Sequence, residues 1–508
     1  MNDASNFRHT SLVLLVVLQT GISAAGLVVE IVAARLIAPY VGMSLYTWTA
    51  IIAIVLAGFS VGHWWGGRLA ALDNRRALTR VAWALVAASV FTASASFVLR
   101  QVASSVLHAF TEPLTAISAI TFAAFFLPSL FAGVPAPVLA VVAMRGRNQS
   151  EQALGMMFAA GAVGAIIGTL MAGFVFISWL GSEITLQLMA AFYASAAAVV
   201  FGMARAAPST LGSAACVTAL GFLMSWQALT APKVCDVESS YYCIRTEVLD
   251  NSAHGPVHVM IIDHLAHGVS ARDAPTIMYT DHTAMLDALP RMRMGERRFS
   301  SFHIGGGTYS VPRAWAFRGQ TEITVAEIDP AVTKAAVNDF WYEVGAATVV
   351  HDDARSFLRS TEQEYDIIVG DAFTDITVPA HLVTREFFEL VSLRLLPSGV
   401  FAMNVVDRVD SLAALASIYR TLQGVFPSVE VWTEATPPRP TERRVFVLLA
   451  GQNDSPVSRL ETLTPDPKQF APLAPKFMDK LVVRAKAPLL SDDFAPIDRL
   501  MGLTSALD

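Results

Sequence analysis

The chain has 508 residues, which is enough for two or three domains. Hydrophobic residues make up 54% of the sequence and charged residues only 15%, with a mean hydropathy of +0.49. Such values are unusual for a soluble protein and indicate segments that cross a membrane. The net charge of −6 gives no reason to expect nucleic acid as a partner. The three cysteines form no paired zinc-binding pattern, so we expect no bound metal.

The first half of the chain is a series of apolar runs, and we assign residues 1–230 to a multi-pass α-helical membrane domain. Each run is close to the roughly 20 residues that cross the core of a bilayer. Seven spans are predicted, at residues 11–34, 47–67, 80–99, 116–143, 155–178, 184–204 and 211–229. The fourth contains Pro128, Pro135 and Pro137, so it is either one kinked helix or two half-helices that re-enter. Because further spans follow the first, the N-terminus is not a simple signal peptide.

Small and polar residues inside the spans predict how the helices pack. The fifth span is rich in glycine, which lets membrane helices approach closely. Its glycines are Gly155, Gly161, Gly164, Gly168 and Gly173. Glu30 and His63 are polar residues within spans, where such residues are often functional. For Glu30 we favour an ion pair with Arg35 or Arg68 over a role in transport.

The basic residues predict the orientation of the chain in the cell membrane. With seven spans, one side carries Arg8, Arg68, Arg75, Arg76, Arg80, Arg145, Arg147 and Arg205. The other side has only Arg35, Arg100 and Lys233 close to the bilayer. The positive-inside rule then places the N-terminus in the cytoplasm and the C-terminal half on the non-cytoplasmic side. Re-entry of the fourth span would reverse the placement of the C-terminal half.

Residues 231–297 form a small β-rich region in which charged residues become more frequent. Two strands around a short turn are expected from residue 235 to 248, and a third strand from 258 to 263. Cys235 and Cys243 are eight residues apart on this hairpin. They either form a disulfide, which suits an oxidising compartment, or are two unrelated buried thiols.

Residues 298–508 alternate between strand and helix patterns, which predicts a doubly wound, mostly parallel sheet of the Rossmann type. Strands are expected at residues 301–305, 322–328, 346–351, 365–370, 399–405, 428–434 and 443–450. Helices are expected at residues 312–317, 330–340, 353–360, 382–395 and 409–424.

A glycine turn followed by an acidic strand end predicts the ligand site of this domain. Gly305, Gly306 and Gly307 follow the first strand and lead into a helix start, where the backbone can approach a ligand closely. Glu327 follows about 20 residues later, where a Rossmann-type fold aims a carboxylate at ribose hydroxyls. Further acids follow neighbouring strands, at Asp329, Asp352, Asp353, Asp371, Asp375 and Asp407. Together they indicate a polar pocket for a nucleoside-containing ligand.

These motifs resemble the spermidine synthases. The matching segments, in order, are His303-Ile-Gly-Gly-Gly307, Val325-Ala-Glu-Ile-Asp-Pro330, Asp353-Ala-Arg-Ser-Phe-Leu358, Tyr365-Asp-Ile-Ile-Val-Gly-Asp371, residues 379–388 and Ser491-Asp-Asp-Phe-Ala-Pro496. The membrane half resembles the fused transporter/spermidine-synthase proteins of bacteria, through Glu30, Arg35, Pro39, Gly42, Trp48 and Gly66-Gly67-Arg68. This resemblance implies that the membrane is the inner membrane of a bacterium. A loose similarity of residues 68–76 to the basic loop of the major facilitator superfamily adds to this.

The resemblance implies aminopropyl transfer from decarboxylated S-adenosylmethionine to a diamine. It places the three glycines around the donor, Glu327 at its ribose with Asp329 beside it, and Asp353 with Ala354 at its adenine. Asp371 matches the catalytic aspartate. A small-molecule amine, the lipid bilayer and a second copy of the chain are the expected partners.

Four positions depart from the pattern of that family. Thr308 stands where the glycine loop usually has an aspartate that binds the amino group of the donor. Asp375 is the second acid of the Asp371 loop, one residue later than usual. His267 or Ala266 replaces a glutamine, and Tyr279-Thr-Asp281 replaces a Tyr-His-Glu motif. We therefore expect Asp375, Tyr279, Asp281 and His267 at the acceptor, and keep two alternatives: a methyltransferase or other S-adenosylmethionine-dependent transferase, and a non-catalytic membrane sensor or transport partner for polyamines.

Overall fold

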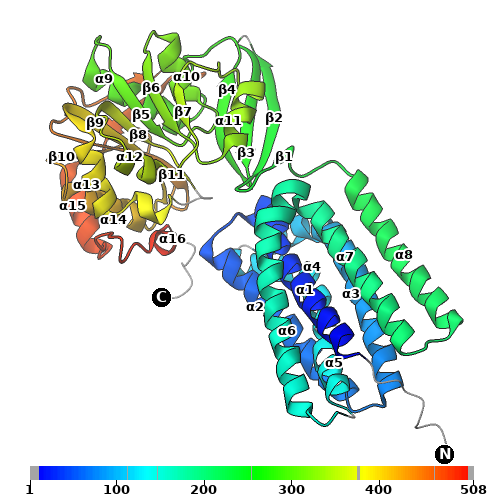
Figure 1. Ribbon diagram of the computed structural model, residues 1–508. Helices are drawn as coiled ribbons and strands as arrows, with labels where there is room; N and C mark the ends of the chain where they lie inside the picture. Colours follow the sequence, from blue (N-terminus) through cyan, green and yellow to red (C-terminus); the bar gives the residue numbers. More distant parts are fainter. Residues whose placement is uncertain are drawn as a thin grey trace, which may run out of the picture. The chain divides into compact units, whose positions relative to one another are not determined.

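The computed structural model describes residues 11–110, 112–145, 147–252, 254–373, 378–462 and 464–501, and the chain divides into two compact units (Figure 1). One is a helical unit, Met1–Val234 with Glu238–Ser240. The other is an α/β unit, Cys235–Val237 with Tyr241–Asp508. The predicted boundary at residue 230 therefore lies close to the observed division.

Long apolar helices make up the helical unit. They are α1 (Leu12–Val41), α2 (Leu45–Leu69), α3 (Asn74–Ala109), α4 (Pro113–Gly133), α5 (Pro135–Met144), α6 (Ser150–Met171), the π-helical turn η1 (Ala172–Phe176), α7 (Ile177–Met203) and α8 (Pro208–Thr230). Six stretches of the described chain are long and apolar enough to cross a membrane. One of these, Ser150–Met203, has 54 residues, which is far longer than a single crossing.

That long stretch consists of two helical segments. Gly181 has φ 76° and ψ 168°, so the helix breaks there. On one side of the break, Ser182 N donates to the carboxylate of Glu238, which lies beside Arg35 near the end of α1. At the far end of α7, the carbonyl of Arg205 accepts from Arg75 at the start of α3. The described part of the chain therefore runs along the helical unit as seven helical segments, and the seven membrane spans expected from the sequence stay a prediction.

The fourth segment crosses the whole helical unit. It begins close to the end of α3, and Arg145, directly after α5, bonds to the opposite connection between α2 and α3. There the Arg145 guanidinium donates to the carbonyls of Ala70 and Leu72, at 2.5 and 2.9 Å, and to Asn74 Oδ1 at 2.7 Å. The alternative of two re-entrant half-helices is therefore wrong for this structure.

The arginines proposed as partners of Glu30 make other contacts. The Arg35 guanidinium donates to the carbonyl of Ser239 at 2.7 Å, and its Nε lies 3.8 Å from the Glu238 carboxylate. Arg68 stacks over the Trp64 ring at 3.7 Å. Glu30 itself is buried in α1. The prediction that a nearby arginine neutralises it finds no support in these contacts.

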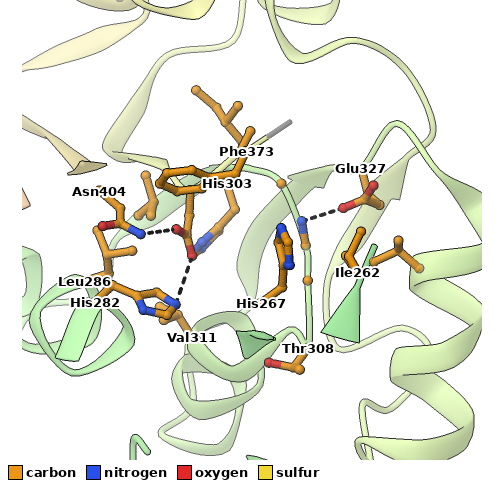
Figure 2. A pocket seen from close by; sticks show the side chains of 18 of the residues that line it. Ile262, His267, His282, Leu286, His303, Thr308, Val311, Glu327, Phe373 and Asn404 are labelled. Carbon is orange, nitrogen blue, oxygen red and sulfur yellow. Dashed lines mark hydrogen bonds and ion pairs between the residues drawn. The ribbon is translucent and has the colours of Figure 1, made fainter. Parts of the chain in front are cut away.

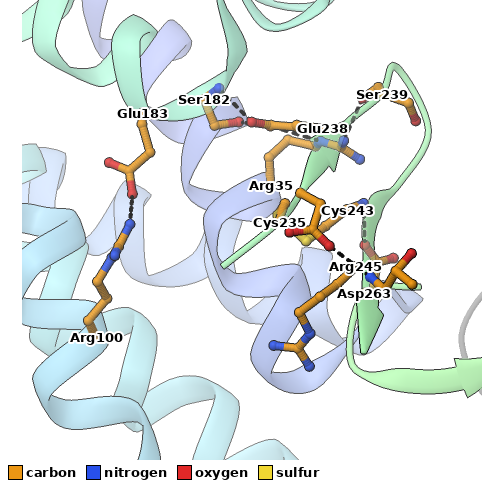
Figure 3. The surroundings of a disulfide bond; sticks show 12 residues. Arg35, Arg100, Ser182, Glu183, Cys235, Glu238, Ser239, Cys243, Arg245 and Asp263 are labelled. Atoms are coloured by element: carbon orange, nitrogen blue, oxygen red, sulfur yellow. Dashed lines mark hydrogen bonds and ion pairs between the residues drawn. A yellow bond between two sulfur atoms is a disulfide. The ribbon is translucent and has the colours of Figure 1, made fainter. Parts of the chain in front are cut away.

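The α/β unit begins with a four-stranded sheet of β1 (Val237–Glu238), β2 (Cys243–Ser252), β3 (Gly255–Ile262) and β4 (Leu265–Ala271), in that order. A disulfide joins Cys235 to Cys243 (Figure 3). The backbone N–H of Cys243 donates to Asp263 Oδ1 at 3.0 Å, which fixes the start of β2. The strand β4 was not predicted, because its sequence has little β-branched or alternating character.

A nine-stranded sheet follows, with the order β12-β13-β10-β11-β9-β8-β5-β6-β7. The strands are β5 (Ser300–Ile304), β6 (Glu322–Ala326), β7 (Thr348–Val350), β8 (Tyr365–Gly370), β9 (Leu395–Arg408), β10 (Ser428–Glu434), β11 (Arg443–Gly451), β12 (Leu460–Thr462) and β13 (Lys468–Pro472). The strands from β7 to β9 in this order pair in parallel, whereas the pairs from β9 to β12 are antiparallel. The expectation of a mostly parallel sheet holds only for the half that carries the glycine turn.

Helices pack on this sheet: α9 (Asp281–Met294), α10 (Ser310–Phe317), α11 (Pro330–Asp339), α12 (Ala354–Ser360), the 3₁₀ turn η2 (Ala380–Leu382), α13 (Arg385–Leu393), α14 (Ala413–Gln423), α15 (Pro475–Arg484) and α16 (Ile497–Leu500). The predicted strands and helices are all present with small changes in their bounds. The elements α9, β12, β13, α15 and α16 were not predicted. The predicted Rossmann-type fold is confirmed for this part of the chain.

The glycines of α6 divide into those that pack on α1 and those that do not. A Cβ added at Gly164 would lie 2.2 Å from the carbonyl oxygen of Thr20, and one at Gly168 would lie 2.3 Å from that of Ala24. Added at Gly155, it would meet nothing within 4 Å. The predicted close packing therefore belongs to the second half of this helix.

Two alanine substitutions on this one helix should change stability in opposite directions. Gly164→Ala should lower the thermal midpoint of the full-length protein in detergent, because the methyl group collides with the α1 backbone. Gly155→Ala is the matched control and should raise the stability by about 0.5–1 kcal/mol, because alanine favours a helix. Equal effects of the two substitutions would contradict the packing described here.

Candidate active site

A cavity of about 470 Å³ lies at the carboxyl ends of the parallel strands (Figure 2). This edge is where open α/β sheets bind their ligands. The neighbouring strands contribute lining residues in the order of the sheet. From β7 to β11 these are Asp352, Glu327, Gly305, Asp371, Asn404 and Arg443.

The glycine turn after β5 brings three strand ends together. Gly305 N donates to the carbonyl of Ala326 at 2.9 Å, and Asp371 N donates to that of Ile304 at 3.0 Å. Gly305 has φ 90°, and a Cβ there would lie 2.8 Å from the carbonyl oxygen of Asp371. Gly307 also has a positive φ, of 51°. Only glycine adopts this backbone so close to a second strand without strain.

Glu327 lines the cavity and holds the glycine turn in place. Its Oε2 accepts from Gly306 N at 2.8 Å, and its Oε1 accepts from Asp329 N at 2.9 Å (Figure 2). Burial raises the pKa of Glu327, while these backbone donors oppose the rise. Each carboxylate oxygen has a second lone pair, so the group can still accept from a ligand hydroxyl.

Asp353 and Ala354 line the same end of the cavity at the start of α12. Asp353 Oδ1 accepts from Ser356 N at 2.8 Å as the N-cap of the helix. Its Oδ2 lies 2.8 Å from His381 Nε2. The carboxylate is thus oriented by a helix start on one side and an imidazole on the other.

Asp371 lines the cavity after β8, between the residues that follow β5 and those of β9. Its Oδ1 accepts from Asn404 Nδ2 at 2.9 Å, and its Oδ2 lies 4.0 Å from His282 Nε2 (Figure 2). Burial raises the pKa of the Asp371 carboxyl, and the nearby imidazole and the Asn404 amide oppose that rise. A carboxylate held in this way can orient a cation or accept a proton.

Several residues expected at the site lie elsewhere. Asp329 caps α11, where its Oδ1 accepts from Ala331 N at 2.9 Å, and it does not line the cavity. Tyr279 Oη lies 3.1 Å from His254 Nδ1, and Asp281 pairs with Lys468 at 2.6 Å. Neither of these two lines the cavity. Asp375 lies outside the described residues.

Residues next to Tyr279 and Asp281 line the cavity instead. Thr280, His282 and Thr283 line it at the start of α9, whereas Tyr279 and Asp281 bond to His254 and Lys468. His267 also lines the cavity as expected, and burial lowers its pKa. The cavity is thus lined by the neighbours of Tyr279 and Asp281 and by His267, and the roles expected for these residues at the acceptor stay predictions.

The lining residues that the sequence did not single out as site candidates include Tyr242, His282, His303 and Asn404. His303 belongs to the buried face of β5, and burial lowers its pKa to about 3. Asn404 lies in the middle of the long strand β9, where no turn or glycine marks it. Among the described residues, no group of three or more His, Cys, Asp or Glu side chains could hold a metal ion.

Comparison with known proteins shows which family the C-terminal part of the chain resembles. Residues 302–458 match the spermine/spermidine synthase domain. A polyamine aminopropyltransferase of Vibrio vulnificus (strain CMCP6) is 29% identical over 209 residues, which are 39% of this chain and 67% of that protein. An N-terminal histidine N-methyltransferase of Emericella nidulans is 28% identical over 202 residues, which are 38% of this chain and 34% of that protein.

Among solved structures, a probable spermidine synthase from Corynebacterium glutamicum ATCC 13032 has a TM-score of 0.43 and 20% identity, and the similarity covers 49% of this chain and 93% of that one. The family match covers only the C-terminal part, so the resemblance of the helical unit to fused transporter proteins stays a prediction. The glycine turn, Glu327 and Asp371 all lie in the part of the chain that matches the spermine/spermidine synthase domain, and the prediction of a transferase is confirmed.

Proposed function

We propose that this protein transfers an aminopropyl group from decarboxylated S-adenosylmethionine to an amine. The observation that carries the proposal is the position of Asp371. It lies in the family-matched domain, between the glycine turn on β5 and the side of the cavity formed by β9 and β11. The donor occupies the β5–β7 side and the acceptor occupies the other.

The donor side suits a nucleoside. Glu327 offers free lone pairs to ribose hydroxyls, and Asp353 with Ala354 borders the place for a base. Gly306 N already bonds to Glu327 and Gly305 N to the carbonyl of Ala326, so these two groups shape the wall of the cavity and do not hold a phosphate. This combination favours an adenosine derivative that carries no phosphate.

The acceptor side suits an amine. The amine must lose a proton before its nitrogen attacks the carbon beside the sulfonium, and Asp371 is placed to orient the ammonium. The positive charge of the sulfonium disappears as the C–S bond breaks. A partly desolvated site that fixes the two reactants in line therefore accelerates the transfer.

Methyl transfer is the second candidate, and the similarity to the Emericella nidulans methyltransferase favours it. Thr308 also favours it, since this buried hydroxyl bonds to Ser310 at 2.7 Å and offers the donor no negative charge. The two activities share the donor side and differ in the group that leaves sulfur. The by-product is methylthioadenosine in one case and S-adenosylhomocysteine in the other.

We further propose that the protein is a multi-pass protein of the inner membrane, with its α/β unit on the non-cytoplasmic side. The six long apolar stretches and the odd number of helical segments support this arrangement. Arg75, Arg145 and Arg205 lie at one end of the helical unit, which the positive-inside rule assigns to the cytoplasm. The disulfide between Cys235 and Cys243 suits an oxidising compartment. The acceptor would then be an exported or membrane-delivered amine.

Asp371→Asn keeps the shape of the side chain and removes its negative charge. We expect turnover to fall by about 10²–10⁴-fold, as when other groups that handle a reacting proton are removed. Binding of methylthioadenosine, measured by calorimetric titration, should be retained. Normal turnover of this variant would rule out the role assigned to Asp371.

Glu327→Gln should weaken methylthioadenosine binding by about 10–100-fold, because a charged acceptor of hydrogen bonds contributes roughly 1.5–3 kcal/mol. The amide also turns a donor toward the N–H groups of Gly306 or Asp329. Asp329→Asn is the matched control, because this residue caps a helix beside the cavity without lining it. An unchanged affinity in Glu327→Gln would contradict the assignment of the ribose site.

The sidedness can be measured with fusions at the C-terminus. We expect an alkaline phosphatase fusion to be active and a fluorescent-protein fusion to be dark. Cys235 and Cys243 should react with a thiol reagent only after reduction. A fluorescent, phosphatase-inactive fusion with both thiols freely labelled would place the α/β unit in the cytoplasm.

A further inference from the structure

His282 lies beside Asp371 at the acceptor side of the cavity, in the first turn of α9. Its Nε2 is 4.0 Å from Asp371 Oδ2, with side-chain exposures of 15% and 25% (Figure 2). Both side chains open into the same space. The two atoms are slightly too far apart for a direct hydrogen bond, so both can contact one ligand atom between them.

The start of α9 does not need this imidazole. Thr280 and Thr283 bond to each other through their hydroxyls at 2.7 Å, and the Thr283 hydroxyl donates to the carbonyl of Thr280. Asp281 is tied to Lys468. The Thr280 hydroxyl lies 3.4 Å from His282 Nε2 and helps to orient the ring. The helix is therefore anchored by its neighbours, and His282 is directed into the cavity.

The other histidines around the cavity are less suited to accept a proton there. Burial lowers the pKa of His303 to about 3, and burial also lowers the pKa of His267. His381 lies beside Asp353 at the donor side. The remaining charged group on the acceptor side of the described lining is Arg443, which accepts no proton.

The reaction needs such a base. An alkylamine is almost entirely protonated at neutral pH, and a carboxylate is a weak base for an ammonium ion. An imidazole binds protons in the range where an enzyme works, which makes it the more effective acceptor. Asp371 then supplies the negative charge that stabilises the imidazolium.

We propose that His282 accepts the proton of the amine substrate and that Asp371 orients both groups, an inference that rests on the transfer reaction proposed above. The ammonium gives one proton to His282 Nε2 and becomes a neutral amine. Its nitrogen lone pair forms a bond to the carbon beside sulfur, and the electrons of the broken C–S bond return to sulfur as a neutral thioether. The product leaves as a secondary ammonium ion, and His282 releases its proton to water.

The test compares His282→Gln with the unaltered full-length protein at two pH values, with decarboxylated S-adenosylmethionine and saturating amine. We expect a loss of about 10²-fold at pH 7. The loss should shrink by up to about tenfold per pH unit toward pH 9, because more of the amine then arrives unprotonated. Methylthioadenosine affinity should be unchanged. Added imidazole should restore part of the activity of His282→Ala.

His254→Gln is the matched control, because His254 lies near the same helix start, bonded to Tyr279, and does not line the cavity. It should show neither the loss nor the rescue. A His282→Gln deficit of equal size at both pH values, or no deficit, would overturn the proton-acceptor role. If the unaltered protein forms no methylthioadenosine, aminopropyl transfer itself is wrong and this inference falls with it.

Discussion

The site depends on the close approach of two backbones, at Gly305 after β5 and at Asp371 after β8. The space between them leaves no room for a Cβ at Gly305. The hydrogen bonds from Gly305 to Ala326 and from Asp371 to Ile304 tie the ends of β5, β6 and β8 together. This constraint sets the distance between the wall of the donor side and the central carboxylate, and the rest of the cavity is arranged around it.

The charges along the strand ends follow from that arrangement. Carboxylates line the donor side, Asp371 stands at the centre, and Arg443 lies at the far side. Burial raises the pKa of both Glu327 and Asp371, so each carboxylate depends on neighbouring polar groups to remain charged. Glu327 has backbone N–H groups, whereas Asp371 has the Asn404 amide and the His282 ring. Glu327 is therefore suited to holding a bound ligand, and Asp371 is suited to orienting the groups that exchange a proton.

Much of this could be predicted from the sequence, because the local signals were strong. Alternating strands and helices, the glycine turn and the acid after the next strand fixed the positions of Glu327, Asp353 and Asp371 along one sheet edge. The glycines of α6 likewise indicated close helix packing, which Gly164 and Gly168 make with α1. The apolar runs also marked the helical segments of the first unit, although only the structure shows that the helix from α6 to α7 breaks at Gly181.

The remaining features depend on tertiary structure. Whether an acid at a strand end faces the cavity or caps a helix is decided by the turn that follows it, and Asp329 caps α11 while Glu327, two residues earlier, faces inward. At the start of α9, His282 lines the cavity and the preceding residue, Asp281, does not. Asn404 is brought to Asp371 by the pairing of β8 with β9, which no local pattern encodes.

The most direct test of the account is the identity of the nucleoside by-product. Purified full-length protein would be incubated with decarboxylated S-adenosylmethionine or S-adenosylmethionine, each with a panel of amines, and the products identified by mass spectrometry. The account predicts methylthioadenosine together with an amine enlarged by one aminopropyl group, and only from the decarboxylated donor. S-adenosylhomocysteine with a methylated acceptor, or donor binding without any product, would contradict it.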